Sequence, residues 1–481
     1  MFKDKEQFLS RLFLITNIVI FGVLVWECTN ISIWSDEAFD LKMIQKPYAY
    51  FLTRLRDAAP PFHFTVLKAF VEFWRQFFPE VNTIHIAKFS SVFSYIILFI
   101  TSNTVIRKRF GALAGSFCGL LCITMPSLFR FGTELRMYSW AVLISFLWFV
   151  AFYEYLENET LLNGIIITVL GTLGVFTHYY IVFGVAYSYI CFFILCVIKK
   201  NYKSAIKIVG VGLGSSILFS PWIYVAYRPL VKVANNFWLP EVTKEKAARD
   251  FFYPFKPDVT KFGIDVIGAV LICIIIVYFV ARWIKEENSN KKLFVLLGIT
   301  MPFVVATIGV FIGKYVFSVF QPRYIMVVMA CFWIAIGISV TNLKSNKYIN
   351  ILIIVFLMGI ALLDVAKNVK DEVEYVTNID TLCDFLDDYS NETIVVDDSR
   401  VWNILPFYAT VESLYDFRKD EQHDEIVEMI ENGETVYYFH SNMYKKDNAY
   451  IDEMKASGYK VELFENTGIE YVKIEIYELS K

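Results

Sequence analysis

The sequence predicts a polytopic α-helical membrane protein that carries a C-terminal extracytoplasmic α/β domain. Hydrophobic residues make up 56% of the 481 residues and charged residues 19%, whereas about a quarter of the residues in a soluble domain are charged. Long apolar runs recur over the first three quarters of the chain. From Asp371 onward, acidic residues clearly outnumber basic ones and short β-type runs replace the apolar segments. These observations separate a membrane part from an acidic, soluble part.

Eleven apolar runs are each near the length that a bilayer core of about 30 Å requires. The predicted spans are 11–27, 89–106, 111–127, 138–154, 161–176, 180–198, 205–225, 263–281, 293–313, 324–341 and 348–364. No small-residue cleavage site follows the first run, so we interpret it as a retained helix rather than a signal peptide. We therefore expect a membrane domain over residues 1–364 and a soluble domain over residues 365–481.

The basic residues favour a cytoplasmic N-terminus. With this orientation, the loops that face inward hold most of the lysines and arginines that flank the spans, as the positive-inside rule requires. The loops that face outward are 28–88, 128–137, 177–179, 226–262 and 314–323, together with everything from residue 365. The sequence thus predicts a multi-pass protein of the plasma membrane whose C-terminal domain is extracytoplasmic.

The segment 60–80 is apolar but carries four polar side chains where the middle of the bilayer would be, namely His63, Lys68, Glu72 and Arg75. Its large apolar residues recur at helical spacing, and Pro60 and Pro61 mark a helix start. We predict an interfacial helix on the outer surface rather than a twelfth span. The external loop 28–88 then begins with the acidic pair Asp36 and Glu37.

The C-terminal domain alternates β-type and helical patterns. The runs ETIVVDD, ETVYYFH, YKVELFE and YVKIEIYEL predict strands, and helices are expected near 378–389, 421–432 and 448–457. This alternation predicts a small α/β domain with a partly parallel sheet. No Gly-rich phosphate loop occurs in it, and its acidity argues against binding of nucleic acid. The eight cysteines show neither a disulfide framework nor zinc-site spacing.

Ionisable residues gather at the outer ends of the predicted spans: Asp36, Glu37, Asp57, His63, Lys88, Arg130, Glu134, Arg136, His178, Lys314 and Arg323. Ionisable side chains that face lipid are costly, so this one-sided distribution predicts a shared cavity. Cations in such a cavity suit a phosphate group, and carboxylates suit proton abstraction or a second cation.

The motifs WSDEAFDL, PPFHF, ELRMY, THYY and QPRY resemble, in this order and spacing, the bacterial branch of the GT-C glycosyltransferases. This branch includes protein O-mannosyltransferase-like and lipid A aminoarabinose transferase-like enzymes, and the resemblance covers roughly residues 10–340. Two positions depart from the pattern: Phe62-His63-Phe64 stands where Leu-Tyr-Tyr is usual, and Lys88 where Arg is common. These departures leave the acceptor preference open.

The resemblance implies a GT-C-like core of about eleven helices. It also implies a hexosyl- or pentosyltransferase that moves a sugar from a polyprenyl-phosphate-linked donor to an acceptor hydroxyl on the non-cytoplasmic side, with inversion at the anomeric carbon. The expected partners are that donor, membrane lipid and a cell-envelope glycan, lipid or protein that accepts the sugar.

Asp36 is the candidate general base, because a carboxylate that removes the acceptor proton lowers the barrier to attack. Its structural alternative is to cap a helix that begins at Glu37. Glu37 either orients the acceptor, holds a divalent cation or stabilises the helix N-terminus through the helix dipole.

Arg136 and Arg323 are the candidate ligands of the donor phosphate, together with Lys314 and Tyr324. Arginine makes bidentate contacts with phosphate that lysine does not, which ranks Arg323 above Lys314. The alternative for each arginine is an interfacial side chain that snorkels to the membrane surface. Tyr324 is expected to stack or hydrogen-bond close to Arg323.

Glu134, His178, His63 and Asp57 are candidates for binding the acceptor or another part of the substrate. Glu134 and Arg136 are two residues apart, so on a helix they point to different faces. His178 hydrogen-bonds the acceptor, binds a divalent cation with Glu37 or Glu134, or serves only the hairpin between two spans. A cation therefore stays an open question in the sequence, and Lys88 is best explained as an anchor of the second span.

Two other classes of function compete with the enzyme. A transporter or flippase of lipid-linked sugars usually shows internal repeats and broken helices near the bilayer midplane, and we find no repeat between the halves of this sequence. A non-catalytic membrane scaffold would tolerate the loss of Asp36. The one-sided polarity and the Asp-Glu pair favour the enzyme.

Overall fold

The structure is a computed structural model, and it describes residues 2–53, 59–236, 243–255, 264–316, 320–342, 346–419, 422–443 and 449–481. The chain forms two compact units. A membrane unit consists of Met1–Trp26 and Lys46–Asn368, and a C-terminal unit consists of Glu27–Gln45 and Val369–Lys481. The first part of the loop 28–88 thus belongs to the same compact unit as the C-terminal residues.

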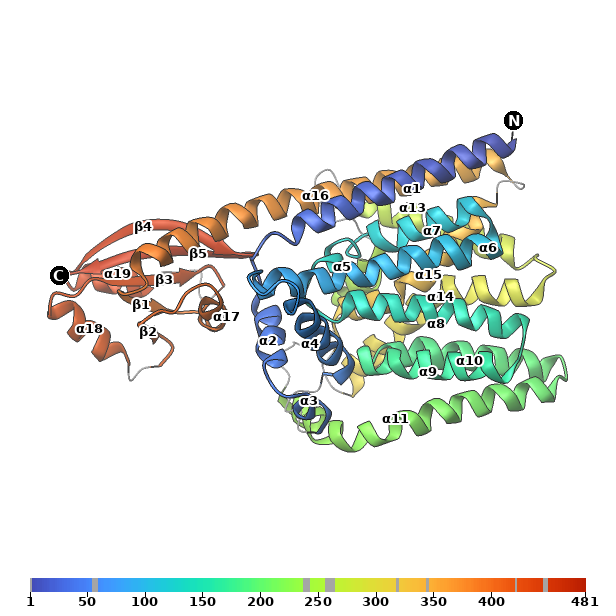
Figure 1. Cartoon of the computed structure of the whole chain (residues 1–481), viewed down its shortest axis with the longest axis horizontal. Helices are drawn as coiled ribbons and strands as arrows, with labels where there is room; N and C mark the ends of the chain where they lie inside the picture. Colours follow the sequence, from blue (N-terminus) through green and yellow to red (C-terminus); the bar gives the residue numbers. More distant parts are fainter. Residues whose placement is uncertain are drawn as a thin grey trace. The chain divides into compact units, whose positions relative to one another are not determined.

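Helices make up the membrane unit (Figure 1). Their bounds are α1 Phe2–Glu27, α3 Tyr48–Thr53, α4 Pro61–Arg75, α5 Thr83–Thr101, α6 Arg107–Phe110, α7 Ala112–Thr124, α8 Tyr138–Glu157, α9 Leu161–Thr177, α10 Ile181–Ile198, α11 Tyr202–Asn236, α12 Lys244–Phe252, α13 Ile264–Trp283, α14 Ser289–Tyr315, α15 Met329–Thr341 and α16 Lys347–Tyr389. Short turns of other helix types join them, namely η1 Ser102–Ile106, η2 Arg130–Gly132, η3 Tyr253–Phe255 and η5 Pro322–Val328.

The predicted polytopic α-helical fold is confirmed. Within the described ranges, nine helical segments are long and apolar enough to cross a membrane, and the shorter apolar helices α7 and α9 occupy the two remaining predicted runs. The predicted helix near 378–389 is not a separate element, because α16 continues without a break from Lys347 to Tyr389.

Close helix packing forms the core of the membrane unit around α15, which packs against α7, α8 and α14. All of its residues from Met329 to Val340 are buried. Glycines allow the backbones to approach: a Cβ atom at Gly298 would lie 2.6 Å from the carbonyl oxygen of Cys331, and one at Gly337 would lie 2.5 Å from Sγ of Cys118. Small residues at such contacts are typical of helices that associate within membranes.

The predicted amphipathic segment forms α4, which packs against α5 and α9. Its buried residues include Phe64, Leu67 and Val71, three of those that define the apolar stripe in the sequence. Pro61 is the first helical residue, where the missing N–H of proline is no disadvantage. The location of α4 at the membrane surface stays a prediction.

The C-terminal unit contains one five-stranded sheet of order β2-β1-β3-β5-β4. Its strands are β1 Thr393–Val396, β2 Ser413–Asp416, β3 Val436–Ser441, β4 Lys460–Ile469 and β5 Val472–Ser480. β1 pairs in parallel with β2 and β3, whereas β5 pairs antiparallel with β3 and β4. The predicted partly parallel sheet is thus confirmed, with β2 as an additional short edge strand.

Helices cover both faces of this sheet, with α18 His423–Glu431 and α19 Ala449–Ala456 on one face and the last part of α16 on the other. The unit also contains α2 Ser35–Ile44, which packs against α17 Ser399–Ile404, and η6 Leu405–Phe407 follows α17. Tyr438 packs with the buried residues of α18 and α19. Its neighbour Tyr437 contacts Phe385 of α16, with ring centroids 5.1 Å apart. Adjacent strand residues point to opposite faces, so the two helix layers enclose the sheet.

Candidate functional site

Two of the predicted phosphate ligands, Arg136 and Arg323, lie close to the same histidine in the membrane unit. Arg136 precedes α8, Arg323 belongs to η5, and His178 follows the last residue of α9. Burial and then the two guanidinium charges lower the pKa of His178 to about 3. A neutral imidazole therefore sits beside two cations that the sequence separates by 187 positions, from 136 to 323.

Aromatic rings hold this cluster. The Tyr138 ring centroid is 5.8 Å from Cζ of Arg323, within the range of a cation–π contact. The Tyr324 ring lies edge-on to His178 at 5.0 Å between centroids, and the backbone N–H of Tyr180 donates to Nδ1 of His178 at 3.3 Å. Because Nδ1 accepts, the proton of the neutral ring is on Nε2, which makes Nε2 a hydrogen-bond donor.

Glu134 is buried close to these residues, with an exposed fraction of 8%. Its Oε2 lies 3.8 Å from Nε of Arg130, and its backbone carbonyl accepts a hydrogen bond from Oγ of Ser91 at 2.7 Å. The carboxylate is thus partly neutralised by an arginine one helical turn earlier. Glu134 also acts electrostatically on Tyr138 and Tyr253, as Arg323 does, so this buried acid lies in the same region as the arginines.

Tyr253 is a member of the site that the sequence did not indicate. It begins η3, hydrogen-bonds Ser127 and interacts electrostatically with Arg130, Glu134 and Arg323. Burial raises its pKa despite the opposing effect of the Ser127 hydrogen bond and the two arginines. Tyr253 lies in the long predicted loop 226–262, where the sequence has no periodic pattern that would mark one residue as part of a site.

The other ionisable residues at the predicted outer ends of the spans lie as follows. Lys314 is exposed at the end of α14, where its Nζ is 5.1 Å from the ring centroid of Tyr315, and none of its contacts among the described residues reaches the cluster. His63 is buried in α4 with its ring 5.5 Å from that of Phe64, and Lys88 is buried in α5. Asp57 lies outside the described residues.

Asp36 and Glu37 belong to the C-terminal unit, in the first turn of α2. Glu37 has an exposed fraction of 2%, and its Oε2 accepts the backbone N–H of Trp34 at 3.0 Å. This contact favours the helix-terminus role among the alternatives for Glu37. Asp36 is half-buried. Helix α2 begins at Ser35, and Trp34 occupies the N-cap position. Asp36 therefore does not cap the helix, which was the structural alternative to its role as a base.

Among the residues that the structure describes, no group of three or more His, Cys, Asp or Glu side chains could hold a metal ion. The cation considered for Glu37, Glu134 and His178 stays a prediction.

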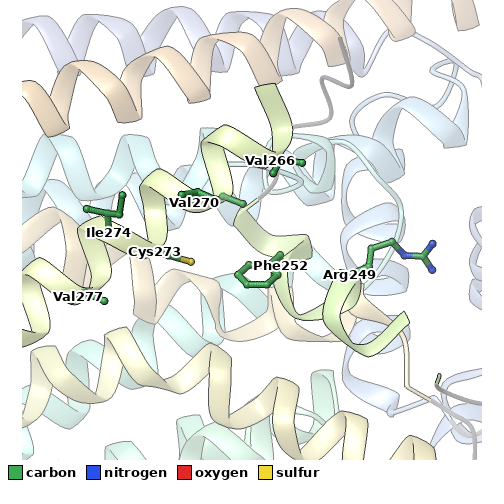
Figure 2. Close-up of a pocket in the computed structure, with 8 residues that line it drawn as sticks. Arg249, Phe252, Val266, Val270, Cys273, Ile274 and Val277 are labelled. Atoms are coloured by element: carbon green, nitrogen blue, oxygen red, sulfur yellow. The ribbon is translucent and has the colours of Figure 1, made fainter. Parts of the chain in front are cut away.

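An apolar groove of about 660 Å³ runs along α13 and ends at α12 (Figure 2). Val266, Val270, Ile274 and Val277 recur at helical spacing on one face of α13. Phe252 and Arg249 of α12 complete its lining. Arg249 is largely exposed, and its Nε lies 3.8 Å from Oδ1 of the buried Asp250. The groove thus combines a hydrophobic length with a cation at one end.

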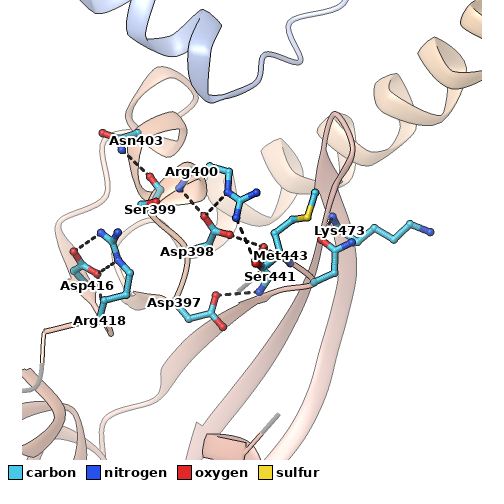
Figure 3. Close-up of polar contacts among 11 residues, drawn as sticks. Asp397, Asp398, Ser399, Arg400, Asn403, Asp416, Arg418, Ser441, Met443 and Lys473 are labelled. Carbon is cyan, nitrogen blue, oxygen red and sulfur yellow. Dashed lines mark hydrogen bonds and ion pairs between the residues drawn. The ribbon is translucent and has the colours of Figure 1, made fainter. Parts of the chain in front are cut away.

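A second polar network lies in the C-terminal unit, at the carboxyl ends of the parallel strands (Figure 3). After β1, Oδ1 of Asp398 accepts from the backbone N–H of Arg400 at 2.7 Å and from its Nε at 3.1 Å. Oγ of Ser441, at the end of β3, donates to Oδ2 of Asp398 at 3.0 Å. After β2, Arg418 forms a bidentate contact with Asp416. These acids are paired internally and stabilise the loops after the strands.

The apolar helices and the small sheet unit define a polytopic α-helical membrane fold. The chain is similar to the solved structure of ArnT, a lipid A aminoarabinose transferase, from Cupriavidus metallidurans in the apo state, with 12% identity over 97% of both chains and a TM-score of 0.56. The same protein bound to undecaprenyl phosphate gives 13% identity, 97% coverage of both chains and a TM-score of 0.56.

A more distant likeness links the chain to the oligosaccharyltransferase of Archaeoglobus fulgidus in complex with Zn and sulfate. The identity is 11%, over 90% of this chain and 69% of that chain, with a TM-score of 0.46. No family model and no curated protein matches the sequence. At these identities, the likeness to ArnT establishes the fold of the chain.

Proposed function

We propose that the chain is a glycosyltransferase that moves a sugar from a polyprenyl-phosphate-linked donor to an acceptor hydroxyl on the extracytoplasmic face of the membrane. The observation that carries this proposal is the pair of arginines, Arg136 and Arg323, beside the neutral His178 in a chain with the fold of ArnT. Two guanidinium groups suit a phosphate because each offers charge-assisted, bidentate hydrogen bonds. That ArnT has been solved with undecaprenyl phosphate supports this class of donor.

The apolar groove along α13 is our candidate for the prenyl chain of the donor. Its lining is almost entirely aliphatic or aromatic, and the residues from Val266 to Val277 extend over about 16 Å of helix. Methyl and methylene groups of a prenyl chain that lies there gain van der Waals contacts with this lining, since lipid around the chain already excludes water. Arg249 at one end suits the anionic end of such a lipid.

The reaction forms one bond and breaks another. The acceptor oxygen attacks the anomeric carbon of the sugar from the side opposite the phosphate, and the bond from that carbon to the phosphate oxygen breaks with inversion. The bonding electron pair leaves with polyprenyl phosphate, whose added negative charge the arginines stabilise. The acceptor proton passes to a carboxylate. We propose Asp36 for this role because it belongs to the acidic pair that follows the first predicted span. General base catalysis of this kind typically contributes 10²–10⁴-fold to the rate.

The test is donor consumption by the purified full-length protein. A panel of radiolabelled polyprenyl-phosphate hexoses and pentoses is incubated with envelope acceptors, and release of polyprenyl phosphate is measured. We expect one donor class to be consumed, and Asp36→Asn to lower turnover by roughly 10²–10⁴-fold while donor binding is retained. Glu462→Gln, at an exposed acid of the same unit, is the matched control.

Two results would overturn the proposal. If no donor is consumed under any acceptor condition, while lipid-linked sugar crosses the bilayer of proteoliposomes, the chain is a transporter. If Asp36→Asn turns over at the normal rate, Asp36 is not the base.

A further inference from the structure

The stretch that precedes Asp36 is held by the far end of the chain. Residues 30–33 are neither helix nor strand, and Asn30 and Ser32 have exposed fractions of 3% and 0%. Nδ2 of Asn30 donates to Oε1 of Glu372 in α16 at 2.7 Å. Oγ of Ser32 accepts the backbone N–H of Glu470, between β4 and β5, at 3.2 Å. An irregular buried segment needs partners for its polar groups, and here they come from more than 300 positions away.

Tyr408 makes the central contact. It follows η6, and its Oη donates to the carbonyl oxygen of Ile31 at 3.1 Å and accepts the backbone N–H of Ile33 at 3.1 Å. One hydroxyl thus bridges both backbone groups that flank Ser32. Burial raises the pKa of Tyr408 well above its usual value, so the hydroxyl keeps the proton that it donates.

Further contacts hold α2 itself. Nζ of Lys42, in its last turn, donates to the carbonyl oxygen of Asn403 at 2.9 Å and to Oδ1 of the same residue at 3.2 Å. The rings of Trp34 and Tyr471 lie 6.0 Å apart at the other end of the helix. Asp36 stands between these points, so its backbone is fixed on both sides by residues of the C-terminal domain.

We propose that Tyr408 is a positioning residue for sugar transfer, which fixes the chain at residues 31–33 and thereby the place of the Asp36 carboxylate. The inference rests on the proposed function, since it takes Asp36 as the base. It gives the C-terminal domain a role in the reaction, although that domain has no evident catalytic set of its own. A base must be held in hydrogen-bond reach of the proton that it removes, so looser anchoring lowers turnover rather than donor binding.

The test compares Tyr408→Phe with Tyr459→Phe in the full-length protein. Tyr408→Phe keeps the ring and removes only the bridging hydroxyl. Tyr459→Phe removes a hydroxyl that donates to Oε1 of Glu431 at 2.7 Å on the exposed side of the same unit. Hydrogen–deuterium exchange of the peptide over residues 28–40 is read by mass spectrometry, and kcat and KM are measured with the consumed donor.

For Tyr408→Phe, we expect exchange at the Ile33 amide to be faster by roughly tenfold, because two hydrogen bonds are lost. We also expect kcat to fall by about tenfold with the KM of the donor unchanged, and Tyr459→Phe to change neither quantity. Ser32→Ala, which loses the contact with Glu470, is expected to act in the same direction.

The inference is overturned if exchange over residues 28–40 is unchanged in Tyr408→Phe, or if exchange rises while kcat stays at the wild-type value. Either result leaves the proposed function intact, provided that Asp36→Asn is inactive. A fully active Asp36→Asn would instead refute the base assignment and the positioning role together, even if exchange had accelerated.

Discussion

Nδ1 of His440 lies 2.7 Å from Oδ2 of Asp397, at the edge of the sheet where β1 and β3 end. Asp397 is fully buried and also accepts the backbone N–H of Ser441 at 3.0 Å. Asp397→Ala leaves these donors without their acceptor, so we expect a loss of roughly 3–5 kcal/mol in local stability. Hydrogen exchange in the peptides of β1 and β3 measures it. Asp424→Ala, an acid in the first turn of α18, is the control, and equal effects of the two variants would contradict the prediction.

Replacement of Arg323 by lysine keeps the charge but removes the bidentate geometry. We expect Arg323→Lys and Arg136→Lys each to raise the KM of the donor by roughly tenfold or more, since a hydrogen bond to a charged group contributes about 1.5–3 kcal/mol. Lys314→Ala removes an exposed cation of the same unit and should change the KM little. Steady-state kinetics with the consumed donor measure the KM of each variant. If Lys314→Ala acts as strongly as the arginine variants, the phosphate does not bind at the cluster.

The lowered pKa of His178 predicts that acid lowers the stability of the folded protein. Its pKa is about 3 in the folded protein and near 6.5 in an unfolded chain, so the unfolded state binds more protons between these values. Its contribution to stability is therefore complete above pH 6.5 and is lost as the pH falls toward 3. Between pH 7.5 and pH 4.5 the loss is roughly 2–3 kcal/mol.

Melting temperatures of the detergent-purified protein at the two pH values measure this loss. His178→Gln should show a smaller drop between pH 7.5 and pH 4.5 than the wild type. Identical drops would show that acid destabilises the protein through other groups.

Filling the groove along α13 tests the binding of the prenyl chain. We expect Val270→Trp to raise the KM of donors with a long prenyl chain while the KM of a short-chain analogue stays unchanged, because only the long chain extends along the helix. Ile223→Trp, at an exposed apolar position of α11, is the matched control. Kinetics with donors of graded chain length provide the measurement. An equal rise for short and long donors would place the prenyl chain elsewhere.

The sequence predicted the membrane helices well, because hydrophobicity over 17 to 20 residues is a local property of the chain. It also selected Arg136, Arg323 and His178, since charges at the ends of spans stand out against apolar neighbours. The structure brings these three side chains together in the membrane unit. The short strand β2 escaped notice, because the four residues of Ser413–Asp416 are too few to show an alternating pattern.

The sequence could not predict the hydrogen-bond partners of residues 30–33, the stretch that precedes Asp36. Asn30 and Ser32 are ordinary polar residues in a short stretch, and no periodicity links them to Glu372 or Glu470. The same holds for Tyr408, one of 29 tyrosines in the chain. Contacts at such sequence separation depend on the tertiary arrangement alone, and only the folded structure reveals them.

The pairing of residues 30–33 with Tyr408 and Glu470 has a consequence for biosynthesis. The ribosome must add more than 370 residues after Ile33 before Tyr408 is made, which takes on the order of 20 to 80 seconds at about 5–20 residues per second. During that interval the contacts of Tyr408 with Ile31 and Ile33 cannot form, and the contact of Ser32 with Glu470 forms later still. The nascent chain therefore acquires the full set of contacts at residues 30–33 only near the end of translation.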